Sequence, residues 1–425
     1  MKRRFCISLA LAALLTIRAT AEQRAIVRVA GTQAILSTAC SLLGCTIVRG
    51  LDDPLGQLFL IGISDTASIS SLLSSLSVYP GILNAEVDSV VRVAQDRPPV
   101  PPALYDTINV PFYGVQVHSG YLSQPAVSIV RLADARNMFG LSGNSAVAVI
   151  DTGVDPTHPV LQGVLAAGYD FTHNRSSGSE KGDVTQSTAA VVDGVSPVYV
   201  NSYTAAGIDQ STAAVVDTQQ YSAFGHGTMV SGIVHLVAPT AIILPLKSFG
   251  PDGSGYISDI LRAVYMSVRS NARVINMSFS IPSSSVEFSR SISYATNSGV
   301  VCVASVGNNG KNMPVYPAAY NGVIGVASTT NDDVRSSFSN FGAPLVWVAA
   351  PGEGVVTTYP YGAYAAAWGT SFSAPLVAGT AALLLQQNRA LTPADVASAI
   401  GHARQLTSDL GNGRLDIVNA LQAGQ

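Results

Sequence analysis

Residues 241–277 contain two short apolar runs, Ala241-Ile242-Ile243-Leu244 and Val274-Ile275-Asn276-Met277. Between these runs, apolar residues recur with the spacing of one face of an α-helix, at Ile257, Ile260, Leu261, Val264 and Val268. Two extended runs joined by a helix form the crossover unit that pairs parallel strands. The segment therefore predicts an α/β fold.

The same alternation continues on both sides of this segment. Further strands are predicted at Val147–Ile150, Val300–Ala304 and Val323–Val326. Apolar runs without polar alternation are typical of strands that are covered on both faces. We therefore expect residues 104–425 to form one domain, a parallel sheet with helices on both faces.

A separate pattern precedes this domain, in residues 22–95. It predicts, in order, a strand, a helix, two strands, a helix and a last strand, at Ala25–Val29, Ile35–Leu43, Thr46–Leu51, Leu58–Ile63, Ile69–Leu76 and Glu86–Val93. This is a small βαββαβ, ferredoxin-like unit. The proline-rich residues 96–103 cannot continue a helix or a sheet, so we expect them to form an exposed linker.

The first 21 residues have the pattern of a signal peptide. Lys2-Arg3-Arg4 precede the apolar run Phe5–Ile17, and Ala19-Thr20-Ala21 provide the small residues of a cleavage site. The apolar run is shorter than the ~20 residues of a membrane-spanning helix, and we expect no span elsewhere. Export is therefore expected, with cleavage after Ala21, to the periplasm or the medium.

Composition excludes several classes of protein. Of 425 residues, 12% are charged and 48% are hydrophobic, which is unlike an intrinsically disordered chain. The chain has 23 Lys and Arg residues and 26 Asp and Glu residues, which gives a net charge of -3. Because it has no excess of positive charge, no nucleic-acid partner is expected. Three cysteines remain after the signal peptide, Cys40, Cys45 and Cys302, and this odd number predicts no disulfide framework. Cys302 lies in an apolar run and is expected to be buried.

An octapeptide is duplicated within the larger domain, since Gln186–Asp193 recurs as Gln210–Asp217. Two copies are too few for a repeat protein, which needs about three or more. We interpret the region near 180–220 as an insertion that carries a duplicated surface hairpin or loop.

Three segments combine a reactive side chain with glycines next to a predicted strand or helix: Val149-Ile150-Asp151-Thr152-Gly153, Gly225-His226-Gly227-Thr228-Met229-Val230 and Gly369-Thr370-Ser371-Phe372-Ser373. Asp151 ends a buried strand, which is where open α/β sheets place their sites. His226 and Ser371 each precede a predicted helix, Thr228–His235 and Ser373–Leu385. An acid, a base and a hydroxyl in this chain order match one of the known orders of a catalytic triad.

These motifs resemble those of the subtilases, the subtilisin-like serine peptidase family. The resemblance implies an endopeptidase in which Asp151 orients His226 and His226 takes the proton of the attacking Ser371. Asn308, in Val306-Gly307-Asn308-Asn309-Gly310, resembles the donor of the family's oxyanion hole. Residues 22–95 resemble the inhibitory, chaperone-like propeptide of the family, which implies an inactive precursor with its own propeptide as inhibitor.

The same resemblance implies where a protein or peptide substrate binds. Ser278, Phe279 and Ser280 match the strand that pairs with an extended substrate. Ser280, Ile281 and Val315 stand where many members have smaller residues along the pocket for the side chain before the cut. Because these side chains add volume, we expect a narrowed pocket that prefers Ala, Val or similarly small residues.

No cofactor is expected to be required. The chain between His226 and Lys247 lacks the loop with which many subtilisins hold calcium. The insertion offers four carboxylates, but their spacing matches no recognised calcium loop, so metal ligands stay unassigned: Asp183, Asp193, Asp209 and Asp217.

Two other interpretations stay open at this point. An aspartic peptidase also uses an Asp-Thr-Gly turn, but it pairs two such turns and this chain has only Asp151-Thr152-Gly153. A catalytically inactive, subtilase-like binding protein would keep the fold without the activity. A serine-directed phosphonate separates these interpretations, because it modifies only a reactive Ser371.

Overall fold

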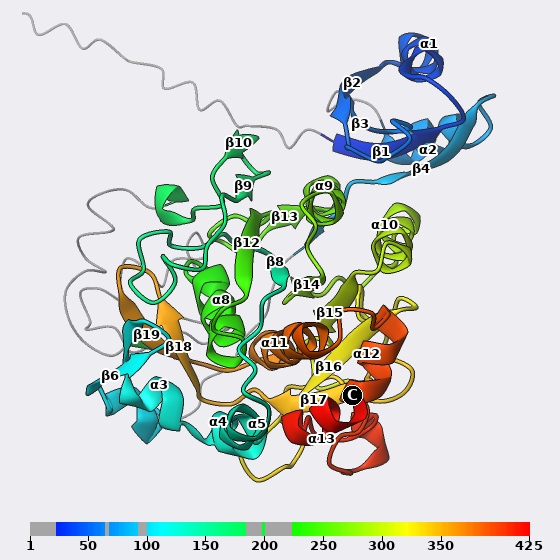
Figure 1. The fold of residues 1–425 in the computed structure, drawn as a ribbon. Helices are drawn as coiled ribbons and strands as arrows, with labels where there is room; N and C mark the ends of the chain where they lie inside the picture. The colour runs from blue at the N-terminus through cyan, green and yellow to red at the C-terminus, as the bar shows by residue number, and fades with distance from the viewer. Residues whose placement is uncertain (1–22, 64–67, 92–99, 184–197, 200–222) are drawn as a thin grey trace, which may run out of the picture. The chain divides into compact units, whose positions relative to one another are not determined.

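The computed structural model describes residues 23–63, 68–91, 100–183, 198–199 and 223–425. They divide into two compact units (Figure 1), one of the residues up to Arg49 with Phe59–Val87, the other of Gly50–Leu58 with Asp88–Gln425. The expected signal peptide and the duplicated segments 186–193 and 210–217 lie outside the described residues. Across the described residues, no helix has the length and apolar character to cross a membrane.

The smaller unit has the predicted βαββαβ order. Its elements are β1 (Gln23–Val29), α1 (Gln33–Leu43), β2 (Cys45–Gly50), β3 (Leu58–Ile63), α2 (Ile69–Ser77) and β4 (Ile82–Val87). The strands form one sheet in the order β2-β3-β1-β4, with β1 antiparallel to β4. The two helices bury apolar side chains in a core that they share with the sheet, among them Leu36, Ala39, Leu72 and Leu76.

The last strand of this unit differs from the prediction of Glu86–Val93. β4 ends at Val87, and a separate strand, β5 (Val90–Val91), pairs with β13 (Gly255–Tyr256), both within the larger unit. Asp88 interrupts the strand because its buried carboxylate accepts hydrogen bonds from Ser258, from N at 3.0 Å and from Oγ at 2.9 Å. Hydrophobic periodicity carries no signal for such a partner.

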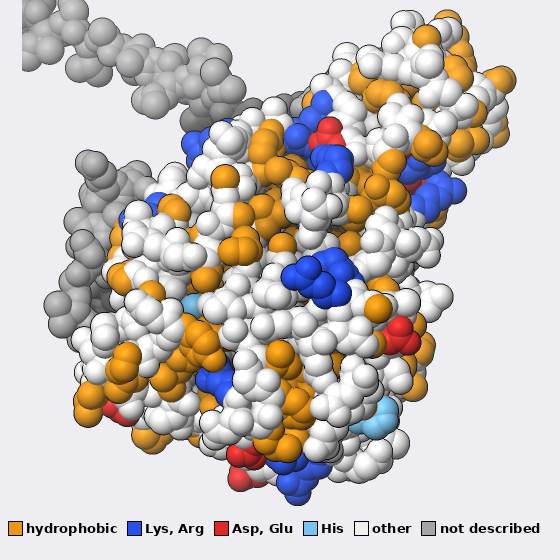
Figure 2. All heavy atoms as spheres, viewed as in Figure 1, with side chains coloured by type: hydrophobic (Ala, Val, Ile, Leu, Met, Phe, Trp, Pro, Cys, Tyr) orange, Lys and Arg blue, Asp and Glu red, His pale blue; other side chains and the backbone are white. Residues whose placement is uncertain are grey.

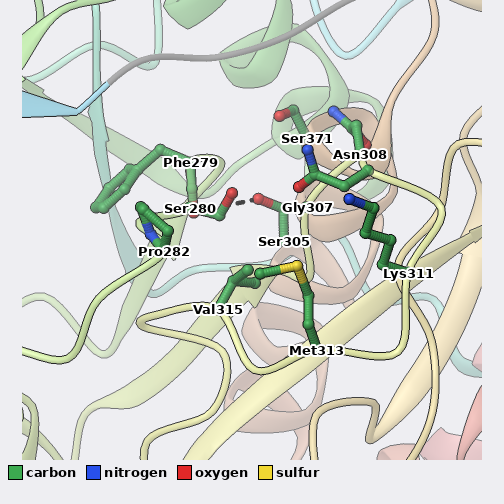
Figure 3. Close-up of a pocket in the computed structure, with 11 residues that line it drawn as sticks. Phe279, Ser280, Pro282, Ser305, Gly307, Asn308, Lys311, Met313, Val315 and Ser371 are labelled. Carbon is green, nitrogen blue, oxygen red and sulfur yellow. Dashed lines mark hydrogen bonds between the residues drawn. The ribbon is translucent and has the colours of Figure 1, made fainter.

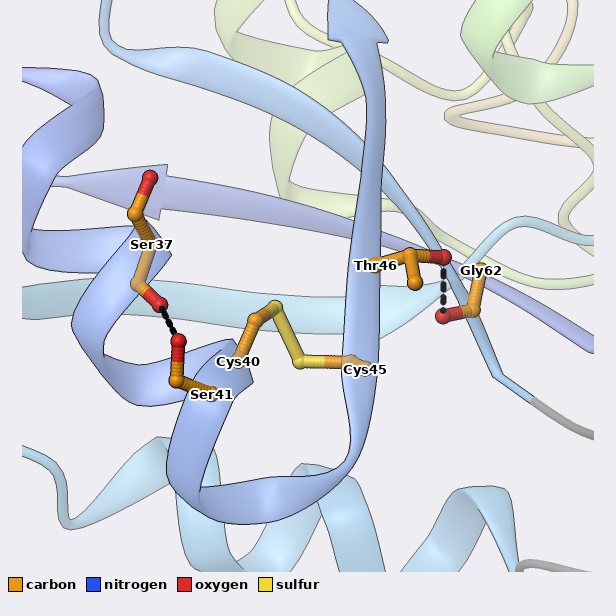
Figure 4. The surroundings of a disulfide bond; sticks show 6 residues. All are labelled: Ser37, Cys40, Ser41, Cys45, Thr46 and Gly62. Carbon is orange, nitrogen blue, oxygen red and sulfur yellow. Dashed lines mark hydrogen bonds between the residues drawn. A yellow bond between two sulfur atoms is a disulfide. The ribbon is translucent and has the colours of Figure 1, made fainter.

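A disulfide joins Cys40 near the end of α1 to Cys45 at the start of β2 (Figure 4). The odd cysteine count predicted no disulfide framework, and it did not anticipate this single local disulfide. Gly44 lies in the left-handed conformation, with φ +74°, and reverses the chain so that the two Cα atoms are 4.5 Å apart. An odd count excludes only complete pairing, and Cys302 is the buried free thiol that was predicted.

The larger unit is built on an eight-stranded sheet in the order β10-β9-β12-β8-β14-β15-β16-β17. The strands from β9 to β17 are parallel, and β10 is antiparallel to β9. Their bounds are β8 (Ala146–Asp151), β9 (Tyr169–Asp170), β10 (Arg175–Ser176), β12 (Ile242–Lys247), β14 (Val274–Met277), β15 (Val301–Ser305), β16 (Val323–Thr329) and β17 (Val348–Pro351). The predicted α/β class is confirmed.

Helices cover this sheet on both faces (Figure 1). α8 (His226–Val237) packs with α11 (Thr370–Gln387) on one face, and α9 (Ile257–Arg269) packs with α10 (Val286–Asn297) on the other. α9 is the predicted crossover helix, and it buries four of the five apolar residues of the predicted face, while Val268 is half-buried. The two helices whose first turns contain His226 and Ser371, α8 and α11, therefore lie together.

The remaining elements surround this core. They are η1 (Pro102–Tyr105), β6 (Asn109–Phe112), β7 (Val115–His118), α3 (Ser119–Ser123), α4 (Pro125–Ile129), α5 (Leu132–Phe139), η2 (Lys181–Asp183), β11 (Val198–Tyr199), β18 (Val355–Tyr359), β19 (Ala363–Ala367), α12 (Pro393–Ile400), η4 (Ser408–Leu410) and α13 (Ile417–Ala423). On the face of the described residues shown in Figure 2, charged side chains are scattered among apolar and uncharged ones, in keeping with the low charge content.

Candidate active site

Asp151 and His226 form a buried, hydrogen-bonded pair. Asp151 is the last residue of β8, and His226 is the first residue of α8. His226 Nδ1 lies 2.7 Å from Asp151 Oδ1, and the residues are 5% and 3% exposed. Since a carboxylate only accepts, the imidazole donates from Nδ1 and keeps the lone pair of Nε2. The pair therefore has the arrangement of a base that an acid orients.

The glycines around His226 are required by close contacts. A Cβ on Gly227 would stand 2.0 Å from the backbone oxygen of Gly153, in the turn after Asp151. Gly225 has φ +87°, and a Cβ there would stand 2.3 Å from the ring of Tyr359. A larger residue at Gly227 would push the start of α8 away from the turn after β8, and one at Gly225 would push it away from Tyr359 in β18 (Val355–Tyr359).

Ser371 lies in the first turn of α11 and exchanges two hydrogen bonds with Ser278. Ser371 Oγ donates to the Ser278 carbonyl oxygen at 2.9 Å, and Ser278 Oγ donates to the Ser371 carbonyl oxygen at 2.7 Å. The His226 ring lies beside Phe372, with ring centres 5.3 Å apart. His226 Nε2 is buried and has no hydrogen-bond partner among the residues that the structure describes. The structure thus places Ser371 near the pair, with its hydroxyl on Ser278 rather than on the base.

Asn308 lies beside Ser371 at one end of a cavity (Figure 3). Its Oδ1 accepts hydrogen bonds from Thr370 N at 2.9 Å and from Thr370 Oγ1 at 2.8 Å. These bonds fix the plane of the side-chain amide, so that Nδ2 faces away from Thr370. The predicted oxyanion donor is therefore held in place by the residue that precedes Ser371.

The cavity beside Ser371 has a volume of about 320 Å³. Phe279, Ser280 and Val315, all predicted to bind substrate, line it together with Asn308 (Figure 3). Ser278 lines a second cavity, which shares Phe279 and includes Asp151 and His226. The predicted substrate-binding residues thus lie on two cavities that meet at Phe279.

The expectation that Ile281 fills the first cavity was wrong. Ile281 is buried elsewhere, and its backbone forms a bridge with Tyr316. Because successive residues of an extended chain point to opposite sides, Ser280 faces the cavity and Ile281 faces away. Lys311 and Met313 also line the cavity, and neither residue belongs to a motif that would have identified it.

A buried lysine lies under the turn that follows Asp151. Lys247 is 0% exposed and its Nζ donates to three oxygens, Thr152 O at 2.8 Å, Phe249 O at 2.7 Å and Asp183 Oδ2 at 2.7 Å. Asp183, considered above as a calcium ligand, is thus an ion-pair partner. Within the described residues, no group of three or more His, Cys, Asp or Glu is placed to hold a metal ion. Asp193, Asp209 and Asp217 lie outside the described residues.

Glu180 is a second buried charged residue that the sequence did not mark. Its carboxyl group lies close to the start of α8 and accepts a hydrogen bond from Gly225 N at 2.9 Å. Burial raises the pKa of Glu180, while its hydrogen-bond donors and Lys247 oppose this shift and favour the carboxylate. No pattern in the sequence connects Glu180 with the motifs of Asp151 and His226, because they meet only in the folded chain.

Comparisons with known proteins identify a family for most of the larger unit. A family model described as the Subtilase family matches residues 142–416. The thermophilic serine proteinase of Bacillus sp. (strain AK1) is 34% identical over 284 residues, which cover 66% of this chain and 62% of that protein. Thermitase of Thermoactinomyces vulgaris is 31% identical over 290 residues, which cover 65% of this chain and 88% of thermitase.

A solved structure supports the fold over a longer range. Fervidolysin from Fervidobacterium pennivorans, described as a keratinolytic enzyme related to subtilisin, matches with a TM-score of 0.70 at 22% identity, over 94% of this chain and 61% of its own. This chain therefore spans less than two thirds of the length of fervidolysin and of the Bacillus proteinase.

Proposed function

Because this chain belongs to the subtilase family, we propose that it is an exported serine endopeptidase that is made as an inactive precursor. Asp151, His226 and Ser371 are its catalytic residues, and Asn308 is its oxyanion-hole donor. The observation that carries the proposal is the buried hydrogen bond between Asp151 and His226, beside a serine that lines a cavity. Its substrates are proteins or peptides.

Catalysis begins when the hydroxyl of Ser371 turns from the Ser278 carbonyl oxygen to His226 Nε2. The imidazole takes the hydroxyl proton as Ser371 Oγ bonds to the peptide carbonyl carbon, and Asp151 stabilises the imidazolium. His226 then gives the proton to the leaving amine, which breaks the C–N bond and leaves an acyl-enzyme. The oxygen of a water molecule then bonds to the acyl carbon as His226 takes its proton, and His226 gives that proton to Ser371 Oγ as the ester bond breaks and the carboxylic acid leaves.

The negative charge on the carbonyl oxygen is stabilised in the proposed reaction by two donors. One is Asn308 Nδ2, and the other is the backbone N–H of Ser371, at the positive end of α11. A side-chain donor of this kind contributes about 10²- to 10³-fold to turnover, a value measured in a member of this family. Asn308→Ala should therefore lower kcat by about that factor.

Residues 22–95 act as the propeptide in this proposal. Val90 and Val91 pair with Tyr256 and Gly255, respectively, as antiparallel strands. β5 consequently runs toward the Gly253 side of β13, and Gly253 lines a cavity with Asp151 and His226. Extended peptides bind proteins by adding a strand in this way. The pairing supports a propeptide that leads into the active site and is cut there.

Export is proposed from the basic and apolar residues at the start of the chain. The disulfide between Cys40 and Cys45 supports it, because disulfides persist mainly in oxidising compartments such as the periplasm and the medium. No cofactor is part of the proposal, since the reaction uses only water and the side chains and backbone of this protein.

A serine-directed phosphonate and the Ser371→Ala variant test the proposal. We expect the phosphonate to label wild-type protein at Ser371, wild type to hydrolyse peptides and lose its propeptide, and Ser371→Ala to accumulate at full length. An inactive binding protein would show neither labelling nor hydrolysis. Hydrolysis that survives Ser371→Ala would indicate an aspartic peptidase. The structure argues against that class, because the partner of Asp151 is the imidazole of His226 and not a second carboxylate.

A further inference from the structure

A buried glutamate contacts both segments that carry the catalytic acid and base. Glu180 is 0% exposed. Its Oε2 accepts hydrogen bonds from Thr152 Oγ1 at 3.0 Å and from Gly225 N at 2.9 Å, and its Oε1 accepts one from Thr228 Oγ1. The mechanism above makes no use of this carboxyl group.

The three donors flank the catalytic pair in the sequence. Thr152 follows Asp151, while Gly225 and Thr228 lie on either side of His226. The hydroxyl of Thr152 also accepts a hydrogen bond from Gly227 N at 2.9 Å, so its own proton is directed to Glu180. A single carboxyl group therefore ties the turn after β8 to the first turn of α8.

We propose that Glu180 is a positioning residue for the reaction. By binding Thr152 and the start of α8 together, it fixes the hydrogen bond between Asp151 and His226. The inference rests on the proposed function, and it adds a residue that is in contact with the supports of the pair rather than with the reacting atoms.

A carboxyl group suits this place better than any other side chain of its size. Its two oxygens meet three donors, one of which is a backbone N–H at the positive end of a helix. Lys247, Asp183 and Tyr359 are the charged or titratable groups that interact with it electrostatically. An amide offers one acceptor oxygen, and an apolar side chain offers none, so either replacement leaves buried donors unpaired.

The test compares the kcat and KM of Glu180→Gln and Glu180→Leu with those of wild type, after processing by a trace of wild-type enzyme where needed. We expect Glu180→Gln to lower kcat about tenfold and Glu180→Leu about 10²-fold, with KM within about twofold, because misplacement of the base slows chemistry without altering the substrate cavity. Glu287→Gln is the matched control. Glu287 is also 0% exposed, but it pairs with Arg290 in α10, so its kcat should stay at the wild-type value.

A double-variant cycle separates positioning from a general loss of stability. Thr152→Val removes the hydroxyl that links Glu180 to Gly227. Because both residues act through this link, the double variant with Glu180→Gln should lose kcat by a factor smaller than the product of the factors of the two single variants. Melting curves establish that each variant is folded at the assay temperature.

A wild-type kcat in folded Glu180→Gln overturns the inference. It is also overturned if the double variant with Thr152→Val loses kcat by the full product of the two single-variant factors. If Glu180→Leu does not fold, these two measurements decide. An absence of hydrolysis by wild type overturns the proposed function itself, and this outcome is distinct because it does not depend on Glu180.

Discussion

Val315 lines the cavity beside Ser371, and we expect it to limit the size of the side chain that this cavity accepts. It is 2% exposed and lies with Met313 at the end of the cavity away from Ser371 (Figure 3). We expect wild type to cleave after Ala about tenfold faster than after Phe, and Val315→Gly to remove that difference, because overpacking costs about 1–3 kcal/mol. Matched peptides that differ only before the cut measure this ratio. Faster cleavage after Phe by wild type would contradict it.

Lys311 gives the same cavity a positive charge. Among the described residues that line the cavity, it is the one charged side chain, and it is exposed to solvent. We expect peptides with Glu before the cut to be cleaved about threefold faster than those with Gln, an effect of the size found for exposed charge pairs. High salt and Lys311→Met should each abolish the difference, while cleavage after Ala stays the same. Equal rates for Glu and Gln at low salt would exclude this role.

We expect the ion pair of Lys247 with Asp183 to stabilise the fold and not to affect the choice of substrate. Both side chains are almost completely buried, and burial raises the pKa of the Asp183 carboxyl group against the effect of Lys247. Lys247→Met removes one partner, and we expect the free energy of unfolding to fall by about 3–5 kcal/mol. Denaturant titration measures the change, with the exposed Lys311→Met as control. A loss within about 1 kcal/mol would mean that the neighbourhood relaxes around Asp183.

At the scale of elements, the pairing of β5 with β13 bears on where the precursor is cut. Val91 lies opposite Gly255, and the antiparallel pairing directs β5 toward Gly253, which lines a cavity with Asp151 and His226. With the family resemblance, this direction favours a cut near Ala94-Gln95, within about three residues on either side. Sequencing the amino terminus of the mature protein measures it, and Ser371→Ala should show no such end. A mature protein that begins beyond Pro111 would contradict the placement.

The elements were predictable where apolar residues mark a buried face. α9 was predicted almost to its ends, because its apolar residues recur with helical spacing from Ile257 to Val268. α8 and α11 begin earlier than predicted. The first residue of α8 is His226, and the first two residues of α11 are Thr370 and Ser371, none of which is an apolar residue that would mark a buried helix face. The same residues were nevertheless found as candidates, because their glycine-rich surroundings form recognisable motifs. Local pattern thus identified the site residues but not the bounds of the elements that hold them.

At the scale of the whole molecule, the unpredicted features are contacts between distant segments. Glu180 meets Thr228 across 48 positions, and Lys247 meets Asp183 across 64. Each residue alone looks like an ordinary surface charge, because its burial depends on several strands and turns that pack around it. The disulfide between Cys40 and Cys45 was missed for another reason, since counting cysteines ignores the turn that brings two of them together.

That disulfide lies in the unit that we propose is removed, so its loss should affect production of the enzyme and not the enzyme itself. Closing the short loop between Cys40 and Cys45 restricts the unfolded chain and stabilises the unit by about 2 kcal/mol. This is a large part of the free energy of unfolding of so small a domain. The double variant Cys40→Ser, Cys45→Ser should therefore yield several-fold less mature protein. Its mature enzyme should have the kcat and melting temperature of wild type, because the changed positions are gone. A wild-type yield would show that the disulfide is dispensable for maturation, whereas an altered mature enzyme would show that the smaller unit stays attached.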